Sequence, residues 1–242
     1  MRYVPAAELG YERIRRDLSA GGPLRLDESY RLAHLPLLAP AHPDAIASRP
    51  GTDYDRGRYT SARRSLVVPI PADRLEASPA FRALDHDVRQ SRLAAKVAWT
   101  VMQARRSRLH ATLANGIGPG PAADAVAALL RAAGTIRSRL GGPLVGERNL
   151  GRIYLPLVPE VRDGGNPLRL VQELAGVTPT GLYLVGYYSL TDHLDAEETA
   201  ALAAMLDRHG RATMLEGRIE RLWLMETHDD LALDSRVVAE LP

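Results

Sequence analysis

The sequence predicts a mixed fold of the α/β or α+β class, and two observations favour it. Segments with the apolar pattern of strands alternate with segments of helical spacing along most of the chain. One strand–helix unit has an echo later in the sequence, which indicates a duplicated unit. Residues 1–64 are less regular and rich in turn formers, which indicates an N-terminal extension or flap.

Length and composition fit one large domain or two closely joined lobes. The chain has 242 residues, of which 45% are apolar, and it has no cysteine. The lack of cysteine excludes disulfides, zinc–thiolate sites and cysteine nucleophiles, and it fits a cytoplasmic protein. No apolar run is long enough for a membrane span, and the N-terminus has no signal-peptide pattern. The formal net charge of +2 argues against an extended contact with DNA.

The N-terminal half begins with the extension. A short helix is predicted at residues 12–20, and residues 32–64 predict a long ordered loop or flap. Residues 65–71 form a compact apolar run between turn formers and predict a strand. Helical spacing then extends over residues 78–106, and the Ser78–Pro79 pair is typical of a helix start.

The rest of the chain predicts further strands and helices in alternation. Capping signals bound the helices, for example the Asn166–Pro167 start and the terminal residues Gly134 and Gly210. Strands are predicted at residues 108–116, 149–159, 181–190 and 218–230, and helices at residues 122–134, 166–177 and 195–210.

The echo connects two of these units. His110 lies in a predicted strand 24 residues before Gly134, and Tyr187 lies in a predicted strand 23 residues before Gly210. An alanine-rich helix precedes the glycine in both cases. The pattern favours a duplicated strand–helix unit in which Tyr187 takes the position of His110.

The stretch HATL, from His110 to Leu113, carries a resemblance to a known family. It matches the His-x-Thr/Ser-apolar motif, and the sequence from about residue 65 to the C-terminus resembles the two-histidine phosphoesterase superfamily, which includes RNA-end cyclic phosphodiesterases. The resemblance implies an α+β domain, residues 65–242, with two pseudosymmetric lobes of antiparallel sheet and outer helices around a central cleft. Residues 1–64 lie outside it.

The motif suits acid–base chemistry on a phosphodiester. Residues i and i+2 of a strand face the same side, so His110 and Thr112 should both face the cleft. The resemblance implies two such motifs around one phosphate, with one imidazole accepting a proton and the other donating one. The second motif is degenerate here, because Tyr187 stands at the histidine position while Ser189 keeps the hydroxyl. No metal or other cofactor is required by this scheme.

Other residues have weaker signals. Arg152 and Tyr154 alternate on one face of a predicted strand and could bind the substrate. His193 follows the second motif and could replace its missing histidine from a loop, although a solvated loop histidine is the simpler interpretation. The stretch with His228, Asp229 and Asp230 is expected to be a surface turn. Residues 53–64 could supply Tyr59, Arg63 or Arg64 to a ligand, but such a segment is more often a polar loop.

These observations leave three functional hypotheses. The first is a divergent, metal-independent phosphodiesterase that acts on a cyclic nucleotide or an RNA end, with His110 and Tyr187 as catalytic residues. Thr112, Ser189, Arg152 and Tyr154 would bind its substrate. The second is a catalytically silent protein that binds a nucleotide or an RNA end in the same cleft. The third is an enzyme of different chemistry whose N-terminal extension contacts the substrate.

Overall fold

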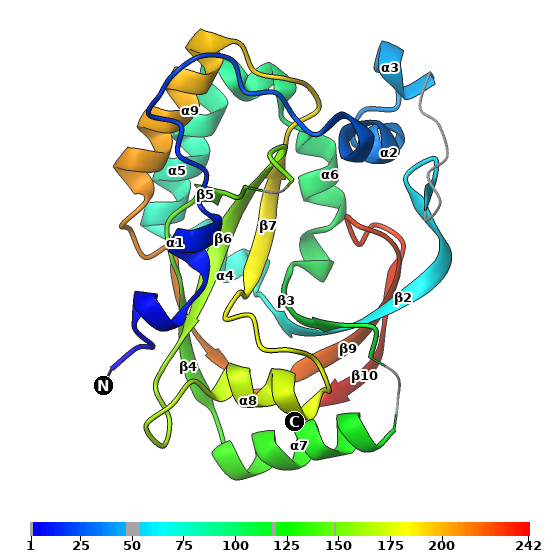
Figure 1. Cartoon of the computed structure of the whole chain (residues 1–242), viewed down its shortest axis with the longest axis vertical. Coiled ribbons are helices and arrows are strands. Elements are labelled where there is room, and N and C mark those ends of the chain that lie inside the picture. Colours follow the sequence, from blue (N-terminus) through cyan, green and yellow to red (C-terminus); the bar gives the residue numbers. More distant parts are fainter. Residues whose placement is uncertain (1, 47–53, 118–119, 148) are drawn as a thin grey trace.

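The computed structural model describes residues 2–46, 54–117, 120–147 and 149–242, and it has an α+β fold. Two five-stranded antiparallel sheets form the centre of the molecule, and helices lie outside them (Figure 1). The predicted fold class is therefore confirmed.

The first sheet joins strands from both ends of the chain. Its central strand β2 pairs with β9 on one side and with β3 on the other, and β10 pairs with β9. The short β1 forms a hairpin with the start of β2. The bounds are Tyr54–Asp55 for β1, Arg58–Pro69 for β2, His110–Asn115 for β3, Leu222–Asp229 for β9 and Ser235–Leu241 for β10.

The second sheet has the same arrangement. Its central strand β6 pairs with β7 on one side and with β4 and β5 on the other, and β8 pairs with β4. The bounds are Ile136–Leu140 for β4, Leu144–Val145 for β5, Arg152–Pro159 for β6, Leu184–Ser189 for β7 and Leu215–Ile219 for β8.

Each half of the chain contributes strands to the other half's sheet. The first half supplies β2 and β3 to the first sheet and β4 to the second. The second half supplies β6 and β7 to the second sheet, and β9 and β10 to the first. This exchange produces two similar lobes, and the edge strands β3 and β7 lie in contact where the lobes meet.

The long helices form two pairs, each with one helix from either half. Helices α5 (Pro79–Gln90) and α9 (Ala196–His209) contact each other, as do α7 (Pro121–Ala133) and α8 (Pro167–Leu174). The second pair covers the first sheet through contacts of α7 with β10 and of α8 with β3. The first pair lies at the opposite end of the molecule (Figure 1).

Capping explains where several helices begin. The side chain of Asn166 accepts hydrogen bonds from the first turn of α8, and Asp195 and Glu198 form a capping box on α9. Ser78 makes no such bond at the start of α5. The helix predicted over residues 78–106 is divided into α5, a 3₁₀ turn at Arg92–Lys96, helix α6 (Trp99–Ala104) and a 3₁₀ turn at Arg106–Arg108.

The N-terminal segment differs from its prediction. The predicted helix at residues 12–20 is only one turn, α1 (Tyr11–Ile14). Helix α2 (Glu28–Leu38) begins before the predicted loop and runs into it. Asp27 caps α2 by accepting from the Tyr30 amide. The buried residues of α2 recur at helical spacing, so one face of the helix packs on the domain. This packing stabilises the helix despite the proline inside it, Pro36.

The boundary predicted between residues 64 and 65 falls inside β2, so the last part of the predicted extension belongs to the first sheet. The remaining described elements are the 3₁₀ turn at Ala6–Glu8, α3 (Pro43–Ile46) and α4 (Ala72–Ala77). Within the described ranges, no helix has both the length and the apolarity to cross a membrane.

Candidate functional site

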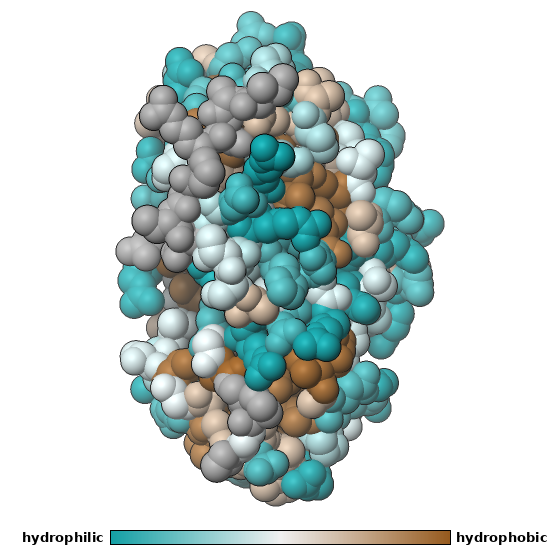
Figure 2. Space-filling model, turned by 90° about the vertical axis from the view of Figure 1, so that its right-hand side faces the viewer, coloured by the Kyte–Doolittle hydropathy of each residue, from teal (hydrophilic) through white to brown (hydrophobic). Residues whose placement is uncertain are grey.

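A cleft of about 540 Å³ is lined by residues of both sheets, and it contains most of the predicted site residues. His110 and Thr112 line it from β3, and Arg152 and Tyr154 line it from β6. Figure 2 shows hydrophilic residues across the middle of the molecular face on the side of α2 and β2, with hydrophobic surface above and below.

His110 is held in one tautomer. Its Nδ1 lies 2.7 Å from the carbonyl oxygen of Arg108, so Nδ1 carries a proton and donates it. Burial, with the positive charges of Arg105 and Arg152, lowers the pKa of His110 to about 4. The neutral ring therefore has Nε2 free as an acceptor at pH 7.

Arg105 is a buried cation beside this histidine. It follows α6 directly, and only 4% of the residue is exposed. Its Nε and Nη1 have no hydrogen-bond partner among the described residues. Burial, with the charge of Arg152, lowers the pKa of Arg105 to about 10. A buried guanidinium without such partners is costly, so it is a strong candidate for anion binding.

Arg152 crosses the neighbouring strand to reach the cleft. A Cβ atom on Gly186 would lie 2.6 Å from Cδ of Arg152, so the arginine side chain passes over the glycine. The guanidinium ends at Asp230, with Nη1 3.1 Å from Oδ2. The nearby Tyr30 and Asp230 raise the pKa of Arg152 despite its burial, so it stays charged.

Asp230 links several parts of the molecule. Tyr59 donates a hydrogen bond to Oδ1 at 3.0 Å, and Tyr30 of α2 donates to Oδ2. Burial raises the pKa of Asp230, but the charges of Arg152 and His34 outweigh it, and the pKa is lowered overall. Asp230 therefore carries a negative charge inside the cleft.

The stretch from His228 to Asp230 was expected to be a surface turn, and this expectation is wrong for its acids. Only 1% of Asp229 is exposed, and its carboxylate accepts from the amides of Leu231, Leu233 and Asp234. This turn positions the next residue, Asp230, at the cleft. His228 is exposed, as expected.

The strands β3 and β7 share an irregularity that corrects the predicted alignment. Each has one extra residue at a register shift against its neighbour, Leu113 in β3 and Tyr187 in β7. Such a bulge changes which side chains face each side of a sheet. It could not be located from the alternating apolar pattern alone.

Aligning the two bulges shifts the second motif by three residues. Thr112 then corresponds to Gly186, and His110 corresponds to Leu184. The prediction that Tyr187 replaces His110 is therefore wrong in register. The cleft has no second imidazole among its lining residues.

Tyr187 does not line the cleft with His110. It lines a small cavity behind Arg105, and its ring packs at 4.8 Å from that of Phe81 in α5. Burial and the nearby Glu76 raise the pKa of Tyr187. The expectation that His110 and Tyr187 face each other across a groove fails, because the bulge turns Tyr187 toward α5.

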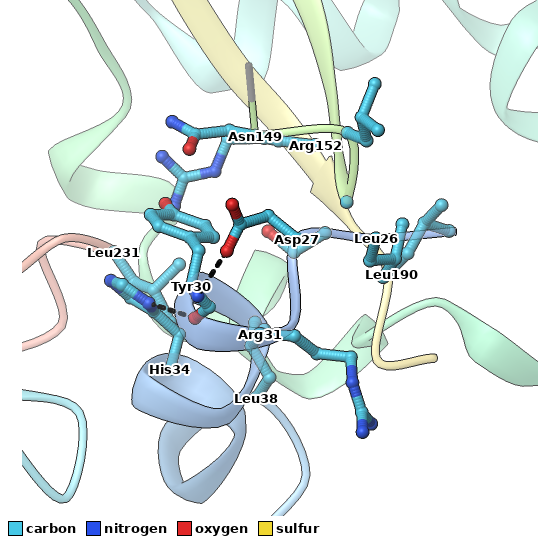
Figure 3. Close-up of a pocket in the computed structure, with 13 residues that line it drawn as sticks. Leu26, Asp27, Tyr30, Arg31, His34, Leu38, Asn149, Arg152, Leu190 and Leu231 are labelled. Carbon is cyan, nitrogen blue, oxygen red and sulfur yellow. Dashed lines mark hydrogen bonds between the residues drawn. The ribbon is translucent and has the colours of Figure 1, made fainter. Parts of the chain in front are cut away.

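Ser189 is adjacent to the cleft but lies in a neighbouring cavity. It pairs with Arg152 across β6 and β7, and both line a cavity of about 20 Å³ (Figure 3). The Ser189 hydroxyl is buried and has no hydrogen-bond partner among the described residues. A cavity of this size holds about one water molecule.

Sequence reasoning missed Arg105 and Asp230. Arg105 had no signal, since it is one of three arginines in the stretch RRSR, residues 105–108, and only the fold decides which one is buried. Among the weaker candidates, Tyr59 lines the cleft, and His193 accepts from the Leu26 amide.

No group of three or more His, Cys, Asp or Glu side chains in the described ranges is arranged to hold a metal ion. The sequence matches no protein-family model and no curated protein. The resemblance to two-histidine phosphoesterases therefore stays a prediction, and the site itself carries the functional argument.

Proposed function

We propose that the cleft binds a small phosphorylated ligand, such as a nucleotide or an RNA end, and that Arg105 is its anchor. Its buried guanidinium, with two nitrogens that find no hydrogen-bond partner in the described ranges, carries this proposal. Phosphate oxygens match the planar donors of arginine, and a bound phosphate supplies the countercharge.

The surroundings of Arg105 support a phosphate ester. His110 and Thr112 line the same cleft and offer an imidazole and a hydroxyl to the ligand. Asn115 and Gln172 line it too and suit the polar groups of a larger ligand. Its volume of about 540 Å³ lies within the range of typical small-molecule sites.

Binding without turnover is favoured over the two-imidazole mechanism. Leu184 occupies the position that corresponds to His110, and it can neither accept nor donate a proton. One observation favours a second candidate, a phosphoesterase with a single histidine. The neutral His110 has Nε2 free as an acceptor, so it can act as a general base toward water or a ribose hydroxyl.

Calorimetric titration tests the proposal. Inorganic phosphate and 2′,3′-cyclic nucleotides should bind, and nucleosides without phosphate should bind far more weakly. Arg105→Met should abolish phosphate binding. Arg169→Met is a matched control, because Arg169 is exposed and pairs with Glu173 in its own helix. Equal phosphate affinity of wild type and Arg105→Met would refute the role of Arg105.

Hydrolysis of 2′,3′-cyclic nucleotides and short RNA ends separates the two candidates. A binding protein turns over none of them. A phosphoesterase with one histidine turns them over, and His110→Ala lowers its rate about 10²–10⁴-fold.

A further inference from the structure

The contact between Arg152 and Asp230 joins the two lobes across the cleft. Arg152 belongs to the second sheet, and Asp230 follows the last residue of β9 in the first. Besides the ion pair, Nη2 of Arg152 donates to the backbone oxygen of Asp230 at 3.2 Å. The positive charge of Arg152 in the cleft is therefore already balanced by the Asp230 carboxylate.

Helix α2 holds that anion in place. Tyr30 donates to the Asp230 carboxylate, and Nε2 of His34 lies 3.8 Å from Oδ2. Figure 3 shows Tyr30 and His34 extending from α2, with Tyr30 directed toward Arg152. His34 is buried and Tyr30 is half-buried, and their rings stack with centroids 4.0 Å apart.

Arg105 and Arg152 line the same cleft, but they differ in the partners of their guanidinium groups. Two nitrogens of Arg105 have no hydrogen-bond partner among the residues that the structure describes, whereas Arg152 forms an ion pair with Asp230. A guanidinium binds a carboxylate or a phosphate with the same donor geometry. A phosphate at Arg105 and the Asp230 carboxylate can therefore compete for Arg152.

We propose that Asp230 is an internal competitor of the ligand, and that α2 sets its strength. This inference rests on the proposed binding of a phosphate ester in the cleft. The ligand phosphate takes Arg152 from Asp230, and its negative charge repels the Asp230 carboxylate. As the carboxylate moves away, its contact with Tyr30 weakens, so ligand binding and the docking of α2 oppose each other.

The test measures the affinity for inorganic phosphate by calorimetry in wild type and three variants. Asp230→Asn removes the competing charge and keeps the shape, so phosphate should bind about tenfold more tightly. Tyr30→Phe removes one donor that holds Asp230, and it should strengthen binding by a smaller factor. Asp234→Asn is the control, because Asp234 lies in the same turn and pairs with the exposed Arg58 outside the cleft.

Hydrogen exchange tests the coupling to α2. Saturating phosphate should speed amide exchange in residues 28–38 of the wild type, because the Tyr30 contact weakens. Exchange that stays unchanged at saturation would overturn the inference.

The outcomes separate this inference from the proposed function. If phosphate binds wild type through Arg105 but Asp230→Asn binds it equally or more weakly, only the internal competition is wrong. If Asp230→Asn binds phosphate and wild type does not, the competition is supported in its strongest form. If neither protein binds phosphate, both the inference and the proposed function are wrong.

Discussion

At the scale of single residues, the cleft combines groups that stabilise a folded protein poorly. Arg105 is a buried cation with two nitrogens that have no hydrogen-bond partner in the described part of the chain, and His110 is a half-buried imidazole beside two arginines. Groups of this kind are common at binding sites, where a bound ligand supplies the missing hydrogen-bond partners and the opposite charge.

Replacing the buried arginine should stabilise the free protein. Arg105→Met removes a charge from the interior and keeps most of the side-chain volume, so the free energy of unfolding should rise by about 1–4 kcal/mol. Urea denaturation of wild type and variant in phosphate-free buffer measures this change. A large loss of stability would show that Arg105 has a structural role.

Gly186 should tolerate no side chain while Arg152 keeps its position. In Gly186→Ala, the new Cβ meets Cδ of Arg152 at 2.6 Å, and the arginine must move away from Asp230. We expect a loss of about 1–3 kcal/mol in the free energy of unfolding. Gly217→Ala in β8 is the control, because its Cβ would meet only Ser138 Oγ, at 3.7 Å. Equal effects of the two variants would contradict the close passage of Arg152.

The low pKa of His110 predicts a pH dependence of stability. The folded pKa is about 4 and the unfolded pKa is near 6.5, so the unfolded state binds more protons between these values. Stability should therefore fall by up to about 3 kcal/mol as the pH drops from 6.5 to 4. His110→Asn should lose less stability over this range than wild type. Urea midpoints across the pH range measure the difference. If the stability of wild type and of His110→Asn fell equally with pH, the low pKa of His110 would be contradicted.

At the scale of elements, local sequence signals succeed where the side chain makes the expected bond. Asp195 caps α9 in a capping box, whereas Ser78 precedes Pro79 at the start of α5 without capping it. A typical N-cap residue should therefore contribute more to the free energy of unfolding at α9 than at α5.

This difference is measurable. Asp195→Ala should lower the free energy of unfolding by about 1 kcal/mol, because it removes the side-chain acceptor of the Glu198 amide in the first turn of α9. Ser78→Ala should change it by only a few tenths of that amount. Thermal or urea denaturation of both variants measures these changes. A similar loss of stability in Ser78→Ala would show that the Ser78 hydroxyl caps α5 in solution.

At the scale of the whole molecule, the exchange of β4 and β9 prevents either half of the chain from completing a sheet alone. One large core cluster also contains residues of both sheets and of the helices. The two lobes should therefore unfold together.

The two tryptophans can test this cooperativity. Trp99 lies in α6, edge-on to Tyr188 of β7, and Trp223 lies in β9 of the first sheet. The variants Trp99→Phe and Trp223→Phe leave one reporter each. Their fluorescence transitions in urea should coincide with the loss of circular dichroism. Two separate transitions would mean that the lobes unfold independently.

The sequence by itself determined the mixed fold class, most strands and long helices after residue 64, and the shared face of His110 and Thr112 in their strand. These features depend on local periodicity and capping, which neighbouring residues specify. Helix α2 also has a local signal in the spacing of Arg31, His34, Leu35 and Leu38, but the surrounding turn formers concealed it.

Only the tertiary structure decided which charges meet in the cleft. The bulge at Tyr187 exists because β7 pairs with β6 in a particular register, and pairing depends on residues far apart in the chain. Likewise, Arg105 is buried because two lobes pack around it, and Asp230 meets Arg152 because β6 and β9 belong to facing sheets. Long-range packing therefore replaced the expected pair of His110 and Tyr187 by one histidine between two arginines.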